Sequence, residues 1–526
     1  MQNICKSSYR NFVRKPVTNM INLLGLAVSL ALVIFLSVYS YSELTTDSYH
    51  KNGDRVYLYA DLNGRMYMPA ILKDQIDLNI PEVESTVRLA GPWEAPVFQA
   101  GERDPITSDI VFADVDFFKL FTYQATEGNL ENALKEPMTV VLTKPLAEKL
   151  FGQERALGKT VKLNNDKELT VSAVINEPKA NTSLKFSAIT SIATRKVLQP
   201  NGGDEFTDWG WSDFQIFILL KEGVKSDESA KKITALFPKN KEDQQDYSKL
   251  KLNPFQTVYF SKFSLFYNYL RCGDKQKVMI LLMVAALVLM IALVNFINIS
   301  SSQWMERLRQ TGILKVIGAS KLSILKNVLS EAFLLFLMSL FFAILIVQIL
   351  FPYISNYTGI HFNPQLLYKP SFLIGSIAGT FVLSMIFSLI PALRISSSKA
   401  IDNLKKTVES GTSNSIFRSI LVTSQFVIAL VLIAFTVLVQ KQVNFGSSNL
   451  GFNQKNIIAI KLTTQFSSKE EVLKKLLQEI PNVAQISLNQ YYPGKTMSHR
   501  TTNQGGEGEK NNSTSTFLVP MPLSLE

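Results

Sequence analysis

Cysteine, histidine and charged residues are all scarce in this 526-residue sequence. The two cysteines, Cys5 and Cys272, lie far apart, so no disulfide framework is implied. The three histidines stand singly and no residues have metal-ligand spacing, so we expect no metal and no cofactor in this chain. Only 18% of the residues are charged and 47% are hydrophobic, a balance that is unusual for a soluble protein.

Charge is missing altogether from five long apolar stretches. Each has about the 20 apolar residues that cross a bilayer, and they cover residues 17–42, 278–299, 332–351, 372–393 and 419–440. Five uncharged helices of this length are not expected in one soluble domain. The first stretch is too long for a secretory signal peptide and no small-residue cleavage site follows it, so it predicts a retained anchor.

The excess positive charge is confined to three short segments. Residues 1–19, 300–327 and 394–418 together hold 14 basic and 3 acidic side chains, which leaves 40 of each sign elsewhere. Because Lys and Arg collect in short cytoplasmic loops, the N-terminus is predicted to be cytoplasmic and residues 43–277 to lie outside. A net charge of +11 therefore gives no support to nucleic-acid binding.

Two stretches imitate nucleotide-binding motifs. "NGGDEF" (201–206), with the Asp114–Lys119 run upstream, resembles the metal- and phosphate-binding elements of diguanylate cyclases, and "GQERALGKT" (152–160) resembles a P-loop. The first two elements lie 88 positions apart, and the glycines of the second have five residues between them instead of four. Both stretches are predicted to face away from cytoplasmic nucleotides. We therefore expect turns in an external domain and no catalytic residue.

Strand and helix patterns alternate in residues 43–277. "EPMTVVLTKPLAEKLFG" predicts a strand and then a helix, "KTVKLNNDKELTVSAVI" predicts a hairpin, and "FQIFILLK" predicts a strand. "SDESAKKITALF" predicts a helix capped by Ser226. The predicted fold class is a polytopic α-helical membrane protein with a large extracytoplasmic α/β or α+β domain.

Residues 417–460 repeat the pattern of the N-terminus. In both places a basic residue leads into a long apolar helix, and Asn-x-x-[Arg/Asn]-[Val/Ile] then leads into a strand. The second copy runs for about 85 residues beyond its helix. Two explanations remain open: the chain is a truncated form of a longer parent, or residues 441–526 are a genuine external tail.

The stretch after the second apolar run is the sharpest feature predicted to be cytoplasmic. Trp304, Leu308 and Thr311 recur at helical spacing among basic residues, which predicts a short amphipathic helix. Gly318 is expected to end this helix, and Ser320 to cap the next one. Such a helix suits either docking against a cytoplasmic partner or anchoring to anionic lipid.

This stretch resembles the coupling-helix signature of the FtsX/MacB permeases, the membrane subunits of mechanotransmission-type ABC transporters. "ADVDFFKLFTYQATEGN", "LTKPLAEKLFG", "ALGKTVKLNN" and "VINEPKANTSLKF" resemble pieces of that family's periplasmic core domain, and "FSLIPALRISSSKAIDNLKK" resembles its exit from the fourth span. The doubled layout is similar to the family's long eight-span members. The resemblance assigns ATPase coupling to Glu306, Arg307, Arg309, Gly312, Lys315, Gly318 and Ala319.

The predicted segments follow from the charge pattern and this resemblance. In order they are a cytoplasmic segment 1–19, a span 20–42, a periplasmic core domain 43–277, a span 278–299, a cytoplasmic coupling helix 300–327, a span 328–351, an external loop 352–371, a span 372–393, a cytoplasmic linker 394–418, a span 419–440 and an incomplete second periplasmic domain 441–526.

The resemblance also implies partners and a function. A separate cytoplasmic ABC ATPase dimer binds the ATP, and membrane lipid and a periplasmic or outer-membrane protein are further expected partners. The expected location is the bacterial inner membrane. The expected function is efflux of peptides or drugs, or lipoprotein handling. The alternative is a ligand-sensing receptor or a regulator of a cell-wall hydrolase, with no transport.

Overall fold

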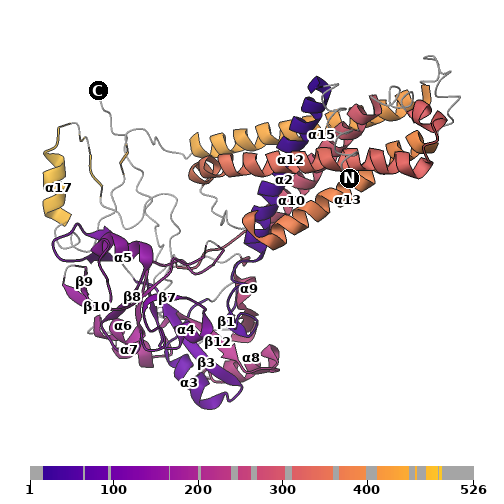
Figure 1. The fold of residues 1–526 in the computed structure, drawn as a ribbon. Coiled ribbons are helices and arrows are strands. Elements are labelled where there is room, and N and C mark those ends of the chain that lie inside the picture. Colours follow the sequence, from indigo (N-terminus) through magenta and orange to yellow (C-terminus); the bar gives the residue numbers. More distant parts are fainter. Residues whose placement is uncertain are drawn as a thin grey trace, which may run out of the picture. The chain divides into compact units, whose positions relative to one another are not determined.

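The structure, a computed structural model, describes two compact units of the chain. Residues 1–44 and 275–446 form the helical unit, and residues 45–274 and 447–526 form the sheet unit (Figure 1). The described residues are 16–62, 66–92, 96–164, 166–179, 181–198, 203–238, 247–261, 269–302, 311–358, 367–397, 412–448 and 470–481, with 457, 458, 483 and 485–487.

Among the described residues, five helices of the helical unit are long and apolar enough to cross a membrane. They are α2 (Pro16–Leu44), α10 (Lys275–Ser302), α12 (Lys321–Thr358), α13 (Pro370–Ser397) and α15 (Thr412–Ser448). Each contains one of the five apolar stretches predicted from the sequence. Many of their large apolar side chains are exposed, as expected for helices whose solvent is lipid.

Four of these helices pack against one another. α2 lies against α10 and α12, and α12 lies against α13. The rings of Phe296 on α10 and Phe336 on α12 meet edge to face at 4.9 Å. The Ser339 hydroxyl donates to the carbonyl oxygen of Leu23 at 3.3 Å, so a polar contact adds to the packing of α12 on α2. None of the most apolar window of α15 is buried against the described chain.

In the described part of the chain, the sheet unit is built on one mixed sheet of 13 strands. Along the sheet the order is β13-β1-β12-β3-β6-β11-β8-β10-β9-β4-β5, and β2 pairs with β12 and β7 with β10. The strands are β1 (Val56–Ala60), β2 (Met68–Pro69), β3 (Val83–Ala90), β4 (Val97–Gln99), β5 (Ile106–Thr107), β6 (Ile110–Ala113), β7 (Ala125–Gly128), β8 (Thr139–Thr143), β9 (Thr160–Leu163), β10 (Lys167–Ile175), β11 (Ala188–Ser191), β12 (Ser212–Leu220) and β13 (Lys251–Pro254).

Short helices lie between these strands in the chain and after the last one. They are α3 (Ile71–Asn79), α4 (Phe117–Leu120), α5 (Lys144–Phe151), α6 (Ile192–Leu198), α7 (Gly203–Thr207), α8 (Ser226–Thr234), the 3-10 turn η1 (Tyr247–Lys249), α9 (Phe255–Val258) and, beyond α15, α17 (Glu470–Gln478). The predicted strand–helix pair is β8 and α5, and the predicted hairpin is the antiparallel pair β9–β10.

Strand β12 explains why "IFILL" (216–220) is a continuous apolar run. Ile216 and Ile218 belong to a core with Leu72 and Ile76 of α3, whereas Phe217 and Leu219 belong to the core on the other face. Because successive side chains of a strand point to opposite faces, a strand buried on both faces needs an apolar residue at every position.

The predicted cap of α8 is wrong. Ser226 is the first residue of the helix, the capping position is occupied by Lys225, and no side chain makes the capping hydrogen bond. The first turn instead carries Asp227 and Glu228, whose negative charges suit the positive end of the helix dipole.

Candidate coupling site

A turn separates the helical residues 311–316, within the segment predicted to couple to the ATPase, from α12. The Gly318 N–H donates to the Lys315 carbonyl at 3.0 Å, and the Ala319 N–H donates to the Leu314 carbonyl at 2.9 Å. These two bonds are the pair that defines a Schellman motif. The helix therefore ends at Gly318, as the sequence predicts.

Glycine is required at position 318 by the backbone. Its φ is +99°, a conformation that residues with a side chain rarely adopt. A Cβ added there meets no heavy atom within 4 Å. Side-chain packing therefore imposes no constraint at this position, and only the turn does.

Ser320 caps α12, which confirms the prediction for this residue. The Ser323 N–H donates to the Ser320 hydroxyl at 3.2 Å, and the Ile324 N–H donates to the Ser320 carbonyl at 3.2 Å. The side chain thus satisfies one of the donors that a helix start leaves open. One helix ends and the next begins within three residues, so the turn has little freedom to bend.

Lys315 ties this turn to α13. Its Nζ donates to the carbonyl oxygen of Ser396 at 2.8 Å, across 81 positions of sequence. Ser396 lies in the last turn of α13, where the carbonyls carry the negative end of the helix dipole. Partial burial and the charge of Lys321 lower the pKa of the Lys315 ammonium.

Apolar side chains are exposed around the same turn. Ile317 is 78% exposed and Val316 69% exposed, and Ile313, Leu314 and Leu322 are also exposed. Exposed apolar residues that gather in this way are typical of surfaces that another molecule covers. Lys315 and Lys321 give the same surface positive charge.

The structure brings together four of the seven residues that the resemblance assigned to coupling. Residues 314–320 are named the capped turn. Gly312, Lys315, Gly318 and Ala319 lie in or beside it. Glu306, Arg307 and Arg309 lie outside the described residues, and their assignment stays a prediction. No sequence pattern points to Ser396 as the partner of Lys315, because a backbone carbonyl is common to every residue type.

One carboxylate from each of the two cyclase-like motifs belongs to a buried ion pair. Asp114 accepts hydrogen bonds from the Arg88 guanidinium, with the shortest nitrogen–oxygen distance 2.8 Å and both side chains less than 10% exposed. Glu205 pairs with Arg195 at 3.1 Å, and Asp213 binds the same guanidinium. These carboxylates are already occupied by arginines inside the core, where an unpaired charge costs several kcal/mol.

The two cyclase-like motifs lie closer in space than their separation in sequence suggested. Arg88, which holds Asp114, lies over the ring of Phe206 at 5.8 Å, so the two motifs are neighbours despite the 88 positions between Asp114 and Gly202. Residues 203–207 form the short helix α7, whereas a turn was expected. Antiparallel pairing of β3 with β6 and with β12 brings the two regions together.

The P-loop-like stretch consists of turns, as expected. Gly152 ends α5 with φ +71° and Gly158 has φ +80°, and Lys159 pairs with Glu154 inside the stretch. Among the described residues no group of three His, Cys, Asp or Glu side chains could hold a metal ion.

The five apolar helices and the large mixed-sheet domain define a polytopic membrane protein with a folded domain outside the lipid. Two family models match the chain: the MacB-like periplasmic core domain over residues 20–236, and the FtsX-like permease C-terminal over residues 282–400. The chain therefore belongs to the FtsX/MacB-like ABC transporter permeases, and its sheet unit contains the periplasmic domain of that family.

Three solved structures are similar to parts of this chain. A domain described as part of a permease from Porphyromonas gingivalis is 18% identical, with a TM-score of 0.33, and covers 44% of this chain and 99% of its own. The periplasmic region of MacB from Actinobacillus actinomycetemcomitans is 17% identical, with a TM-score of 0.28, and covers 35% and 83%. The extracellular domain of YknZ, a noncanonic ABC-type transporter from Gram-positive bacteria, is 14% identical, with a TM-score of 0.26, and covers 34% and 93%. No curated protein matches the chain.

Proposed function

We propose that this ABC transporter membrane subunit works by mechanotransmission. A separate cytoplasmic ATPase dimer binds and hydrolyses ATP and pushes residues 304–320. The membrane helices then transmit this movement to the periplasmic domain, which acts on a substrate that is already outside the cytoplasm. In this proposal the chain itself has no catalytic residue and no cofactor.

The capped turn at Gly318 is the observation that carries the proposal. A force applied to residues 311–317 reaches α12 through a turn with little freedom, and it reaches α13 through the Lys315–Ser396 hydrogen bond. The exposed Ile317 and Val316 offer an apolar contact for the ATPase, flanked by lysines. FtsX/MacB-like permeases work with such an ATPase, which supports this kind of partner.

The transmembrane helices favour mechanical coupling over ion-driven transport. In the described helices that are apolar enough to cross a membrane, the acidic residues are Glu43, in the last turn of α2, and Glu331, in the first third of α12. Transporters driven by ions place charged residues near the middle of the bilayer. The proposed activities are efflux of peptides or drugs, or lipoprotein handling.

A second candidate function is a receptor or a regulator of a cell-wall hydrolase. A receptor needs an output domain in the cytoplasm. Each of the two segments between spans that we propose to be cytoplasmic, 300–327 and 394–418, has no more than about 30 residues. We therefore favour the transporter. The proposed location is the bacterial inner membrane with the N-terminus in the cytoplasm, which the three basic segments support.

An experiment on Ile317 separates ATPase docking from lipid anchoring. Full-length chain carrying Ile317→Glu is expressed in its native cell and purified from membranes, and the ABC ATPase that co-purifies with the wild type is followed. We expect the ATPase to be lost from the complex while insertion stays normal, because the glutamate places a charge in an apolar contact. The Arg307→Glu/Arg309→Glu double variant and Gly312→Pro are expected to act in the same way.

The matched control for the Arg307→Glu/Arg309→Glu variant is Arg103→Glu/Arg155→Glu. It makes the same charge change in the sheet unit, where both arginines are exposed. Retention of the ATPase by all three coupling variants contradicts the proposed docking site. Lipid anchoring instead predicts that Ile317→Glu weakens membrane association of this segment, detected by its accessibility to a water-soluble label, while the ATPase stays bound.

A further inference from the structure

The chain enters the sheet unit from α2 at Thr45 and leaves it toward α10 after Asp274. On the entry side, the Asp47 N–H donates to the Asn181 carbonyl at 3.0 Å, and the Asn181 side-chain amide donates to the Thr45 carbonyl at 3.2 Å. The Asp47 Oδ1 accepts hydrogen bonds from the Thr182 hydroxyl and the Ser183 N–H, both at 2.9 Å. The first residues after α2 are therefore fastened to residues 181–183.

The exit side is fastened to the same loop. The Arg271 N–H donates to the Ser183 carbonyl at 2.7 Å, the Lys185 N–H donates to the Tyr269 carbonyl at 2.7 Å, and Leu184 forms an antiparallel bridge with Leu270. Residues 181–185, which we name the junction loop, thus hold both ends of the sheet unit. Asp47 lies three residues after α2, and Arg271 lies four residues before α10.

A close backbone approach holds the exit segment further. The Gly273 N–H donates to the Tyr259 carbonyl at 2.7 Å. A Cβ on Gly273 would lie 2.2 Å from a ring carbon of Tyr259, which is itself buried. Only glycine can lie this close to the ring without displacing it.

The junction loop leads directly into the middle of the sheet. It follows β10 and precedes β11, and β8 pairs with both of these strands. A displacement of the loop therefore acts on three neighbouring central strands. Both membrane connections reach these strands through a loop of five residues.

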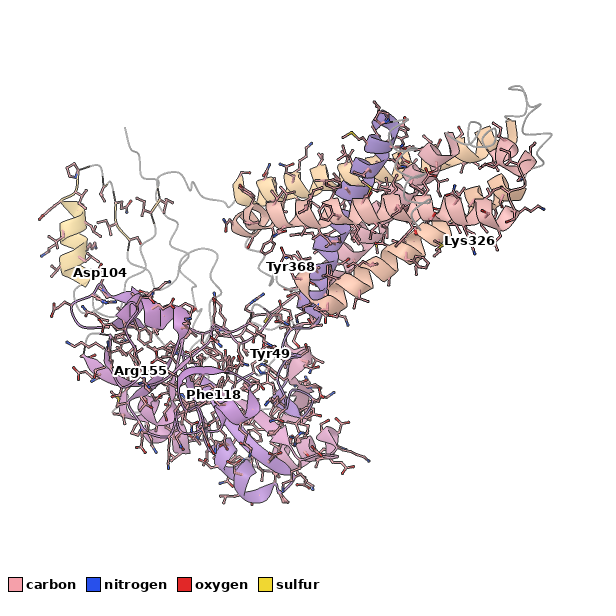
Figure 2. The ribbon with its side chains drawn as sticks, in the orientation of Figure 1. Tyr49, Asp104, Phe118, Arg155, Lys326 and Tyr368 are labelled. Carbon is pink, nitrogen blue, oxygen red and sulfur yellow. The ribbon has the colours of Figure 1, made fainter. Side chains whose placement is uncertain are left out.

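The entry side of this junction is strained. Asp47 is fully buried with φ +62°, a left-handed conformation that is uncommon for any residue except glycine. Its second carboxylate oxygen has no hydrogen-bond partner in the described chain, and neither does the nearby His50 Nε2. Figure 2 labels Tyr49 in this cluster. Unpaired buried polar groups and unusual backbone angles both cost free energy and concentrate where function demands them.

We propose that the junction loop is the joint through which both membrane connections move the periplasmic domain as one body, with Asp47 as its positioning residue. This inference rests on the proposed function. Asp47 fixes the loop on the α2 side, and the loop fixes the segment that leads to α10. Removal of the Asp47 carboxylate then frees both connections together, including residues 269–271, which lie on the opposite side of the loop.

Hydrogen exchange of the full-length chain in lipid nanodiscs tests the joint without any partner. We expect Asp47→Ala to speed exchange by at least about tenfold in residues 181–185 and equally in 269–271. Asp47→Asn keeps an acceptor and tolerates the left-handed backbone, so it is expected to stay near the wild type. The matched control is Asp114→Asn, which removes a buried charge elsewhere and should leave both segments unchanged.

A variant on the other side of the loop covers the case in which Asp47→Ala fails to fold. Gly273→Ala is expected to speed exchange in 269–271 and also in 181–185, because the Tyr259 clash displaces the exit segment. Faster exchange confined to the substituted side of the loop, in either variant, overturns the joint.

The functional arm uses the chain purified with its ATPase. In the wild type, ATP analogues are expected to change exchange in β8, and in Asp47→Ala this change should disappear while ATP hydrolysis stays within about twofold. A nucleotide-dependent change in β8 that persists in Asp47→Ala overturns the proposal. If no ATPase binds the wild type, the proposed function fails, and the partner-free exchange experiment still decides whether the joint exists.

Discussion

The Nζ of Lys315 donates to the carbonyl oxygen of Ser396 at 2.8 Å and so joins the end of the predicted coupling helix to the last turn of α13. The bond makes α13 a second route for a push that begins at the capped turn.

Lys315→Met is expected to loosen the capped turn. The substitution keeps the length of the side chain and removes the charged donor, which at this half-buried site is worth about 1 kcal/mol. Amide exchange in residues 311–319 should rise about fivefold, and stimulation of the ATPase should fall. Lys326→Met, on the exposed side of α12 (Figure 2), removes the same charge and serves as the control. Equal exchange in both variants would show that the bond has no role.

Gly318→Val is expected to open the same turn by a different route. A β-branched residue at φ +99° is strained even though space for its side chain is available, at a cost of about 1–2 kcal/mol. The amide of Ala319, which donates to Leu314, should lose protection. Gly318→Asn, whose side chain tolerates positive φ, should lose less. If the Ala319 amide exchanges as fast in Gly318→Asn as in Gly318→Val, backbone strain is not the cause.

Glu205→Ala is expected to destabilise the sheet unit by about 3–5 kcal/mol, because it leaves the buried Arg195 short of a partner. The midpoint of urea unfolding, followed by the fluorescence of Trp209 and Trp211, measures this loss. Asp104→Ala removes a carboxylate from an exposed position, labelled in Figure 2, and should leave the midpoint unchanged. A small effect of Glu205→Ala would mean that Asp213 alone compensates Arg195.

Asp47 and His50 are expected to oppose each other's pH dependence. Burial raises the pKa of Asp47 to about 6 and lowers the pKa of His50 to about 4. As the pH falls from 7 to 4, the folded state takes up a proton at Asp47 before the unfolded chain does, which stabilises the fold. The unfolded chain takes up a proton at His50 first, which destabilises the fold. The contributions of Asp47 and His50 to the free energy of unfolding therefore nearly cancel over this range.

Single substitutions should reveal each contribution. Relative to the wild type, Asp47→Asn should lose up to about 3 kcal/mol of stability between pH 6 and 4, and His50→Gln should gain a similar amount between pH 6.5 and 4. Urea unfolding at several pH values measures both. The other groups that face Asp47 are Arg271, Tyr49 and Tyr123, and burial raises the pKa of both tyrosine hydroxyls, so they stay neutral in this range. Parallel pH curves for all three proteins would contradict the expectation.

The local structure around the coupling site could be predicted from residue types. Gly318 and Ser320 have chemistry that suits only a few backbone positions, so the helix end and the next helix start were correctly placed. The cap at Ser226 was wrong because its neighbour Lys225 supplies the extended residue before the helix, and the acidic first turn replaces the side-chain bond.

The sequence by itself determined the five apolar helices, the β9–β10 hairpin and the Schellman turn at Gly318, because apolar length, strand alternation and glycine conformation are local properties. Only the tertiary structure decided that Lys315 meets Ser396, that Arg88 and Arg195 occupy the carboxylates of the cyclase-like motifs, and that one loop fastens both ends of the sheet unit. These contacts join residues 10 to more than 80 positions apart, several through backbone groups common to every residue type. Residue types carry no record of such partners, so only the folded chain selects them.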